Sequence, residues 1–319
     1  MLSIINHKIN HNINHNINHN INHDINNKKS NIVFKHITIV KVKCLLYIIE
    51  IIRNELSKMG WRCDIIDKKE INYYINLNNS EHYFLFLWPL HINDDVIHYK
   101  RYILYQLEQN INNQLSTNYE KLHDTKKLKK IYDNAKLLID YCQLNINVLN
   151  QYYSNKFKIM NIPARYIDTN ETATNYEYDI IFVGSMNDKR FNILKQLKTK
   201  YNVLIVENIY DNELKKLCNK SNICLNIHYY ENAILERVRL NEMLEYGIKI
   251  ISEKPCDDDI DICNYYQSIY FIEMISDSCE ELFKTIDDIK SDTDNKSNAS
   301  DLKHLESIFK QDIHSLFTF

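Results

Sequence analysis

Glycine and proline are scarce in this chain, which has 319 residues and only three of each. A glycine-rich GxGxxG loop, the fingerprint of dinucleotide-binding enzymes, is therefore excluded. No apolar run reaches the ~18 residues of a membrane span, and the first residues lack the basic segment and apolar core of a secretory signal. The eight cysteines contain no CxxC pair and mostly lie in apolar runs. We therefore expect free thiols in a reducing compartment, and a cytoplasmic protein.

The composition is that of a globular protein, with 45% hydrophobic and 25% charged residues. A chain of this length is long enough for two domains of ordinary size, each with its own core. The formal net charge of -3 gives no electrostatic reason to expect a nucleic-acid partner.

Residues 1–30 form a low-complexity repeat in which histidine recurs every four residues among asparagine and isoleucine. Wound as a helix, this segment would align its imidazoles as a metal-binding stripe. Asparagine is a poor helix former, however, and such a composition cannot bury a core. We therefore expect a disordered tail.

The first folded domain is expected at residues 31–168. Residues 37–42 read as a strand, apolar positions from Leu45 to Leu56 have helical spacing, and Gly60 lies just past that helix, where left-handed backbone is common. Further strands are predicted at 62–66, 83–89, 102–105, 137–141 and 157–161, and further helices at 119–136 and 145–153. This alternation predicts a parallel sheet in a Rossmann-like domain.

A second domain is expected at residues 179–290, after a polar connection at 169–178. An apolar strand from Asp179 meets Gly184 and Ser185, and a helix follows at 189–200. A glycine after a strand lets backbone N–H groups approach a phosphate, and a helix N-terminus favours an anion. Many α/β folds use the same junction only to turn the chain. Residues 291–319 are expected to form a flexible segment and a terminal amphipathic helix that packs back on the body.

Residues 222–254 read as strand, helix, glycine turn and strand, with the apolar strands at 223–227 and 248–252. Between them, apolar residues recur at helical spacing from Ile234 to Leu244. Arg239 and Glu242 lie three residues apart, so they share one helix face, with Glu236 a turn earlier. Such a pair is either an ordinary surface contact or a polar site opposite a ligand.

This stretch resembles a known family. Arg239-Leu240-Asn241-Glu242, then Gly247, then a strand ending in Ser252-Glu253 is similar to the nucleotide-sugar domain of group 1 glycosyltransferases, and closest to their spore-maturation-like branch. In the common pattern a second glutamate lies eight residues before the first, but that position is Ile234 here, so Glu236 is only a loose substitute. The glycine-rich loop of the first domain is missing as well.

The resemblance implies the GT-B fold, in which two Rossmann-like domains face each other across a cleft. It implies transfer of a sugar from a nucleoside-diphosphate sugar to an unidentified acceptor, without a bound metal or another cofactor. Arg239 with Lys189 or Arg190 would hold the diphosphate and Glu242 the ribose. The implied donor site comprises Gly184, Ser185, Lys189, Arg190, Asn226, His228, Tyr229, Arg239 and Glu242. The run RYILYQLEQ implies that Gln106 and Glu108 face the acceptor side of the cleft, although each also fits the start of a surface helix.

Three further hypotheses belong beside this one. The missing glutamate and glycine loop favour a catalytically inactive GT-B-like module that binds a glycan or a nucleotide. A sugar-nucleotide epimerase is a weaker alternative, because no GxGxxG follows the first strand. The acidic run Asp257-Asp258-Asp259 is consistent with a divalent-cation site, but a solvated loop explains it better.

Overall fold

The computed structural model describes residues 35–77, 80–109, 125–153, 157–167, 175–274, 278–291 and 297–318. Residues 36–319 form one compact unit, distinct from residues 1–35, and only the former is described below. The expected low-complexity tail at 1–30 lies outside the described residues. Among the helices that the structure describes, none has the length and apolar character needed to cross a membrane.

The first sheet has the strand order β2-β1-β3-β4-β5-β6, and all its strands are parallel. Its strands are β1 (His36–Val40), β2 (Arg62–Ile66), β3 (His82–Phe86), β4 (Tyr102–Gln106), β5 (Leu137–Asp140) and β6 (Phe157–Ile159). The central strands β1 and β4 are buried along their whole length, as expected for a sheet covered on both faces.

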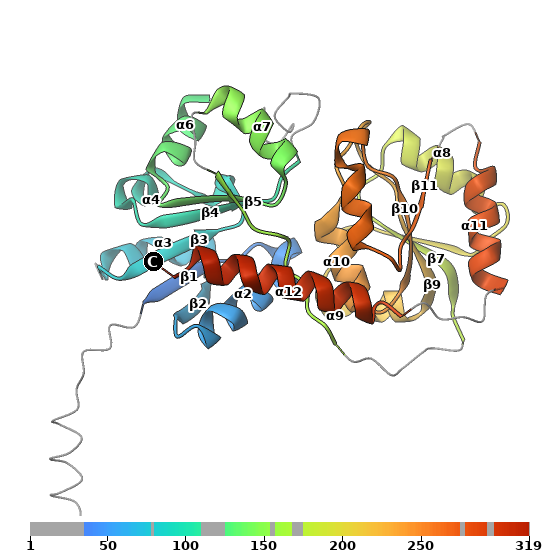
Figure 1. The fold of residues 1–319 in the computed structure, drawn as a ribbon, viewed down its shortest axis with the longest axis horizontal. Coiled ribbons are helices and arrows are strands. Elements are labelled where there is room, and N and C mark those ends of the chain that lie inside the picture. The colour runs from blue at the N-terminus through green and yellow to red at the C-terminus, as the bar shows by residue number, and fades with distance from the viewer. Residues whose placement is uncertain are drawn as a thin grey trace, which may run out of the picture. The chain divides into compact units, whose positions relative to one another are not determined.

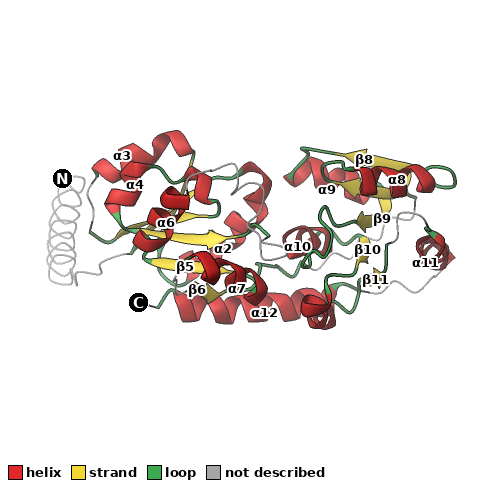
Figure 2. Cartoon of the chain, turned by 90° about the horizontal axis from the view of Figure 1, so that it is seen from above, coloured by secondary structure: helices red, strands yellow, loops and turns green. Residues whose placement is uncertain are grey.

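Helices cover both faces of this sheet (Figures 1 and 2). Its helices are α2 (Leu46–Lys58), α3 (Ile71–Asn76), α4 (Asp94–Tyr99), α6 (Thr125–Asn134) and α7 (Gln143–Tyr152), with short 3-10 turns η1 (Lys43–Leu45), η2 (Lys68–Glu70) and η3 (Pro89–His91). One core contains Ile48 and Ile52 of α2, and the other contains Val96 of α4 and Leu128 of α6. Successive residues of a strand point to opposite faces, so Ile103 joins the first core and Leu104 the second.

The second sheet has the strand order β11-β10-β9-β7-β8 and is also parallel throughout. Its strands are β7 (Tyr178–Val183), β8 (Val203–Val206), β9 (Ser221–Asn226), β10 (Lys249–Glu253) and β11 (Tyr270–Ile272). Its helices are α8 (Asp188–Leu197), α9 (Asp211–Asn219), α10 (Arg237–Glu245) and α11 (Glu280–Ser291), with the 3-10 segment η4 (Asp257–Tyr265). Helices α8 and α11 pack on one face and α9 and α10 on the other.

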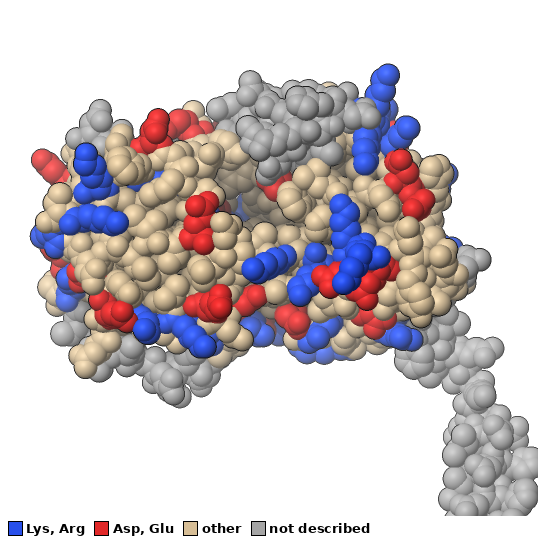
Figure 3. Space-filling model, turned by 180° about the vertical axis from the view of Figure 1, so that it is seen from behind, with Lys and Arg blue, Asp and Glu red and all other residues tan. Residues whose placement is uncertain are grey.

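The last helix, α12 (Ala299–Leu316), packs against α2, which covers the first sheet, and against α10, which covers the second (Figure 1). Leu302 and Leu305 lie in the core beside α10, while Phe309 and Ile313 lie in the core beside α2. Asp312 accepts hydrogen bonds from the backbone and side chain of Asn161, both at 2.9 Å. Charged side chains of both signs are interspersed on the face that Figure 3 shows.

Most predicted elements are confirmed, among them β2 at the predicted residues and Gly60 after α2 with φ of +87°. Two expectations are wrong. The helix of the 222–254 stretch begins at Arg237, not Ile234. Ile234 is instead buried in the core that α2 and α12 form with the first sheet. The acidic run is not a fully solvated loop, because Asp259 is 8% exposed within η4, although Asp258 is exposed.

Candidate functional site

The second sheet reverses its winding between β7 and β9, since β8 lies on one side of β7 and β9 on the other. Open α/β sheets bind ligands at the carboxyl ends of strands beside such a reversal. Gly184 follows β7 there, with φ of +145°. A Cβ at this position would lie 3.3 Å from Nη1 of Arg190 and 3.3 Å from Nη2 of Arg239. Glycine therefore allows two guanidinium groups to approach the same turn.

Arg239 is held by two acceptors, and both contacts use Nη1. It donates to Oδ1 of Asn226 at 2.8 Å and forms an ion pair with Glu236. Asn226, at the end of β9, is fully buried and donates in turn to the hydroxyl of Ser252 at 3.0 Å. The Arg239 side chain is 24% exposed. Asn226 and Glu236 therefore fix the orientation of the Arg239 guanidinium, while part of the side chain stays open to solvent.

Glu236 immediately precedes α10 and joins the two arginines. Its Oε2 contacts Arg239 and its Oε1 lies 3.3 Å from Nη2 of Arg190. The carboxylate is 13% exposed, so both contacts form in a partly desolvated setting, where charge-assisted hydrogen bonds are strongest.

Arg190 lies behind this cluster. Only 2% of the residue is exposed, and its guanidinium donates to the carbonyl oxygens of Ser185 and Ile227. Burial lowers its pKa to about 10, so the group stays charged at neutral pH. Its environment is that of a buried structural cation.

Lys189, the neighbouring residue, points elsewhere. Its Nζ lies 2.6 Å from Oε1 of Glu253, whose Oε2 accepts the backbone N–H of His228 at 2.8 Å. The pKa of His228 is lowered because the ring is buried, and its Nε2 is buried without a partner among the described residues. Tyr229 is 41% exposed, with its ring centre 5.2 Å from Cζ of Arg190.

A cavity of about 340 Å³ opens above the Gly184 turn. Gly184, Ser185, Glu236, Arg239 and Glu242 belong to its wall. The second sheet with its helices and loops adds Val183, Glu207, Asn208, Ile209, Tyr210, Leu214, Arg237, Val238 and Met243. The segments that follow strands of the first sheet add Cys44, Leu45, Leu107, Gln109 and Tyr141. The carboxyl ends of β4, β5, β7 and β8 thus meet at one cavity. The described lining does not include Lys189, Arg190, Asn226, His228 or Tyr229.

Glu242 has an unusual environment for a carboxylate. It is 9% exposed, and burial raises its pKa to about 7. Its Oε1 accepts the hydroxyl hydrogen of Tyr246 at 2.7 Å. This carboxyl on the wall of the cavity therefore changes its charge near neutral pH.

Gln106 and Glu108 lie beside the cavity without lining it. Gln106 is fully buried, and its Nε2 donates to Oδ2 of Asp140 at 3.1 Å and to the carbonyl of Glu108 at 2.7 Å. Burial raises the pKa of Asp140 to about 8. The residues directly after Gln106 and Glu108 in the chain, Leu107 and Gln109, line the cavity instead.

Several lining residues were missed by the sequence analysis, notably Tyr141, Glu207 and Arg237. Tyr141 and Glu207 directly follow β5 and β8, so the rule applied to β4 and β7 would have found them. Arg237 is 6% exposed, with Nη2 3.6 Å from Oδ1 of Asp259. No local pattern signals that pairing.

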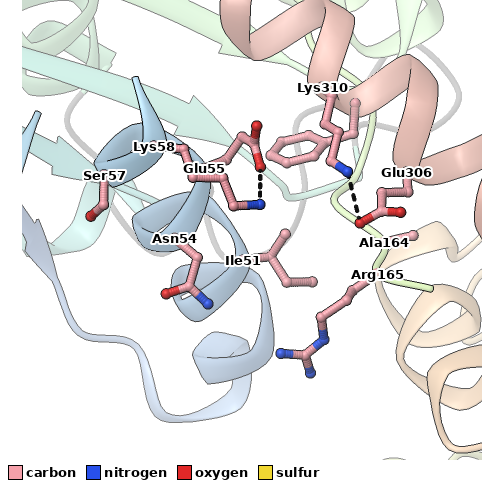
Figure 4. A pocket seen from close by; sticks show the side chains of 10 residues that line it. Ile51, Asn54, Glu55, Ser57, Lys58, Ala164, Arg165, Glu306 and Lys310 are labelled. Atoms are coloured by element: carbon pink, nitrogen blue, oxygen red, sulfur yellow. Dashed lines mark hydrogen bonds and ion pairs between the residues drawn. The ribbon is translucent and has the colours of Figure 1, made fainter. Parts of the chain in front are cut away.

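A second cavity, of about 330 Å³, lies between α2, residues 164–165 and α12 (Figure 4). Its Lys58 and Lys310 pair with Glu55 and Glu306, and Arg165 pairs with Glu245 at 3.1 Å. It contains none of the predicted site residues.

Known proteins resemble this chain in fold, but no family model matches its sequence. An uncharacterized protein, L140 of Acanthamoeba polyphaga mimivirus, is 28% identical over 171 residues, which are 50% of this chain and 55% of the relative. The match thus spans about half the length of that relative.

Solved structures match much more of the chain. HepE of Anabaena in complex with UDP-glucose aligns with a TM-score of 0.55 and 8% identity, covering 89% of this chain and 100% of that one. Sucrose-phosphate synthase of Thermosynechococcus elongatus gives 0.55 and 10%, covering 89% and 98%. AviGT4, a glycosyltransferase of avilamycin A biosynthesis, gives 0.55 and 7%, covering 88% and 95%.

The chain has the GT-B fold. Two parallel sheets, each covered by helices on both faces, confirm the predicted fold class. In this GT-B fold the Gly184 turn, Arg239 and Glu242 belong to the second sheet, and Leu107, Gln109 and Tyr141 bring the first sheet to the same cavity.

Proposed function

We propose that this protein transfers a sugar from a nucleoside-diphosphate sugar to an acceptor. The observation that carries the proposal is Arg239, anchored against Gly184 and partly open to the cavity where four strand ends meet. HepE, of the same fold, has been solved with UDP and with UDP-glucose.

In the proposed complex the diphosphate lies above the Gly184 turn. The bond between the sugar's anomeric carbon and the diphosphate oxygen breaks, a bond to an acceptor oxygen forms, and the acceptor's hydroxyl proton passes to the departing diphosphate. Negative charge grows on the diphosphate as its bond breaks, and a preorganised cation stabilises it without further rearrangement. Arg239 supplies that cation, and the N-terminus of α8 adds its dipole.

Glu242 accepts hydrogen bonds from the ribose hydroxyls in this proposal. The acceptor enters along the wall formed by Leu107, Gln109 and Tyr141. Asn226 acts by orienting Arg239, whereas Lys189 reaches the donor only if it leaves Glu253. Gln106 and Glu108 would shape the acceptor wall from behind.

We also propose that the chain belongs to the spore-maturation-like branch of the family, because its helix contains the pattern Arg239-x-x-Glu242. We propose a cytoplasmic location as well, because the eight cysteines are free thiols. We place no metal in the mechanism, because Arg239 supplies the positive charge at the leaving diphosphate.

The alternative is an inactive module of the same fold that binds a nucleotide or a glycan. It is favoured by Ile234, which is 3% exposed where the family pattern has a glutamate. The enzyme would hold a nucleoside-diphosphate sugar in the cavity and the module a nucleotide or a glycan, so binding and turnover must be measured separately.

A thermal-shift screen of the full chain against UDP, GDP, ADP and their common sugar conjugates tests the proposal. A ligand at one hundred times its dissociation constant adds about 2.7 kcal/mol. We expect one nucleotide to raise the melting temperature, Arg239→Ala to abolish the shift, and Lys195→Ala, an exposed change on α8, to preserve it. Release of free nucleotide from the sugar conjugate supports the enzyme, whereas binding without release supports the module. No shift in a folded sample contradicts the enzyme and favours the inactive module, with a glycan as its ligand.

A further inference from the structure

Arg190 and Lys189 are adjacent cations that sequence resemblance offers equally as diphosphate ligands, but Arg190 is enclosed by protein. Its Nε and Nη2 donate to the carbonyl oxygen of Ile227, at 3.0 and 2.5 Å, and its Nη1 donates to that of Ser185 at 2.8 Å. The rings of Phe182 and Tyr229 lie 5.3 and 5.2 Å from Cζ. All three nitrogens are therefore engaged with protein oxygens.

These contacts join three segments, and Ser185 and Glu236 in two of them line the donor cavity. Ser185 belongs to the turn after β7, Ile227 follows β9, and Glu236 precedes α10. Arg190 thus ties the glycine turn to the neighbouring strand end, on the two sides of the sheet reversal. Lysine has one nitrogen and no planar fork, so it cannot make the same three connections.

Glu236 carries the effect of Arg190 forward to the cavity. One of its oxygens faces Arg190 and the other faces Arg239. The carboxylate and Asn226 together hold Nη1 of Arg239, which leaves Nη2 against Gly184. The series Arg190, Glu236, Arg239 runs from a fully buried cation to a partly exposed one.

We propose that Arg190 is a positioning residue: through Glu236 and the Ser185 carbonyl it aims Arg239 at the donor diphosphate and does not itself contact the donor. This inference rests on the proposed function. Holding a cation in one orientation removes the cost of ordering it when charge develops on the diphosphate.

A double-mutant cycle on nucleoside-diphosphate affinity tests the inference. Dissociation constants are measured by calorimetry for wild type, Arg190→Lys, Arg239→Ala and the double variant, with UDP, GDP or ADP, whichever stabilises the wild-type chain. We expect Arg239→Ala to weaken binding by ~10- to 100-fold, as for loss of a charged hydrogen bond, and Arg190→Lys by ~5- to 30-fold.

The double variant decides between the two roles. If Arg190 acts only through Arg239, Arg190→Lys weakens binding no further once Arg239 is alanine. If the two losses multiply, Arg190 contacts the diphosphate and the inference is overturned. It is also overturned if Arg190→Lys binds like wild type while Arg239→Ala does not. The matching nucleoside, which lacks phosphates, should bind Arg190→Lys and wild type equally.

Glu236→Gln provides a second route, because Arg190→Lys changes a buried site and its folding must first be checked by circular dichroism. The glutamine variant keeps the shape but removes the charge that bridges the arginines, so we expect weaker diphosphate binding. Tighter binding would mean that Glu236 competes with the diphosphate for Arg239, and would overturn its positioning role. If wild type binds no nucleoside diphosphate, the proposed function itself fails, which is a distinct result.

Discussion

Arg237 donates a hydrogen bond from Nη1 to the carbonyl oxygen of Tyr141, at 3.0 Å, and so joins the start of α10 to the end of β5. Two more contacts tie the same segment to the first sheet. Nε2 of Gln109 donates to the carbonyl of Ile234 at 3.2 Å, and the hydroxyl of Tyr47 donates to that of Val238. The segment from Ile234 to Val238, which contains Glu236, is thus hydrogen-bonded to residues of α2 and of the loops that follow β4 and β5.

Replacing Arg237 with alanine should be strongly destabilising. Arg237 and Asp259 are 6% and 8% exposed and lie 3.6 Å apart, so the variant leaves a buried carboxylate without its cation. We expect a loss of about 3 kcal/mol in the free energy of unfolding, measured with guanidinium chloride.

Arg62→Ala is a suitable control for that variant. Its side chain is 69% exposed and its Nη2 lies 3.6 Å from Oδ2 of Asp64, so we expect a loss below about 0.5 kcal/mol. Adding Asp259→Asn to Arg237→Ala should restore part of the stability. A loss below ~1 kcal/mol for Arg237→Ala would contradict a buried charge pair.

Gly184→Ala and Gly60→Ala form a matched pair. Both glycines have positive φ, +145° and +87°, so alanine should cost each about 1 kcal/mol of stability. A Cβ at Gly184 would also meet the guanidiniums of Arg190 and Arg239 at 3.3 Å, whereas a Cβ at Gly60 meets nothing within 4 Å. We therefore expect Gly184→Ala to lose nucleotide binding and Gly60→Ala to keep it. Equal affinities in the two variants would remove the Gly184 turn from the donor site.

The fold could be predicted from the sequence because apolar strands and amphipathic helices are recognised from the spacing of residues close together in the chain. The sequence also singled out Gly184, Arg239 and Glu242, which line one cavity in the structure, since strand ends and helix spacing are visible in the chain. It could not separate Lys189 from Arg190, because adjacent helix residues point in different directions and only the core decides which is buried. Asp259 was misplaced for a related reason: its partners, Arg237 and the backbone N–H of Leu235, lie more than twenty residues away in the chain.

His82 should make the first sheet sensitive to acid. It is 2% exposed, its Nε2 lies 2.8 Å from Oγ1 of Thr38 and its Nδ1 lies 3.0 Å from the Tyr99 hydroxyl. Burial, then His36 and Arg101, lower its pKa from 6.5 to about 4, with Asp64 opposing. A base with a lowered folded pKa contributes stability that is present above pH 6.5 and lost as the pH falls toward 4.

Urea unfolding at several pH values tests this prediction against His82→Gln, which cannot take up the proton. Between pH 6.5 and 4 we expect wild type to lose about 1–3 kcal/mol relative to the variant, allowing for solvent screening. The comparison is needed because buried acids such as Asp140 change stability in the opposite direction. Parallel pH profiles of the two proteins would contradict the prediction.

Metal removal should leave sugar transfer unchanged. In the proposed mechanism Arg239 supplies the positive charge at the leaving diphosphate, so no metal ion is required there. We expect nucleotide release from the donor to be the same with and without excess EDTA. A loss of activity that Mg²⁺ or Mn²⁺ restores would show that a metal shares the diphosphate.

Glu242 should make nucleoside binding depend on pH near neutrality. Burial raises its pKa to about 7 from 4.5, with Tyr246, Asp211, Glu245 and Arg239 as smaller influences. The carboxylate accepts hydrogen bonds from ribose hydroxyls more strongly than the neutral acid does. Affinity for the nucleoside should therefore rise by up to about tenfold from pH 6 to pH 8, as the group ionises. The nucleoside is the right probe because it has no phosphate to titrate.

Glu242→Gln separates this carboxyl from every other titrating group. The variant should bind the nucleoside with low affinity at both pH values, and a 2′,3′-dideoxy nucleoside should show no pH dependence with wild type. Stability should move the other way: an acid with a raised folded pKa stabilises the fold below pH 4.5, and that contribution is lost as the pH rises through 7. Wild type should thus become less stable from pH 5 to 8 relative to Glu242→Gln while it binds the nucleoside more tightly. If the variant keeps the pH dependence of binding, the ribose lies elsewhere in the cavity.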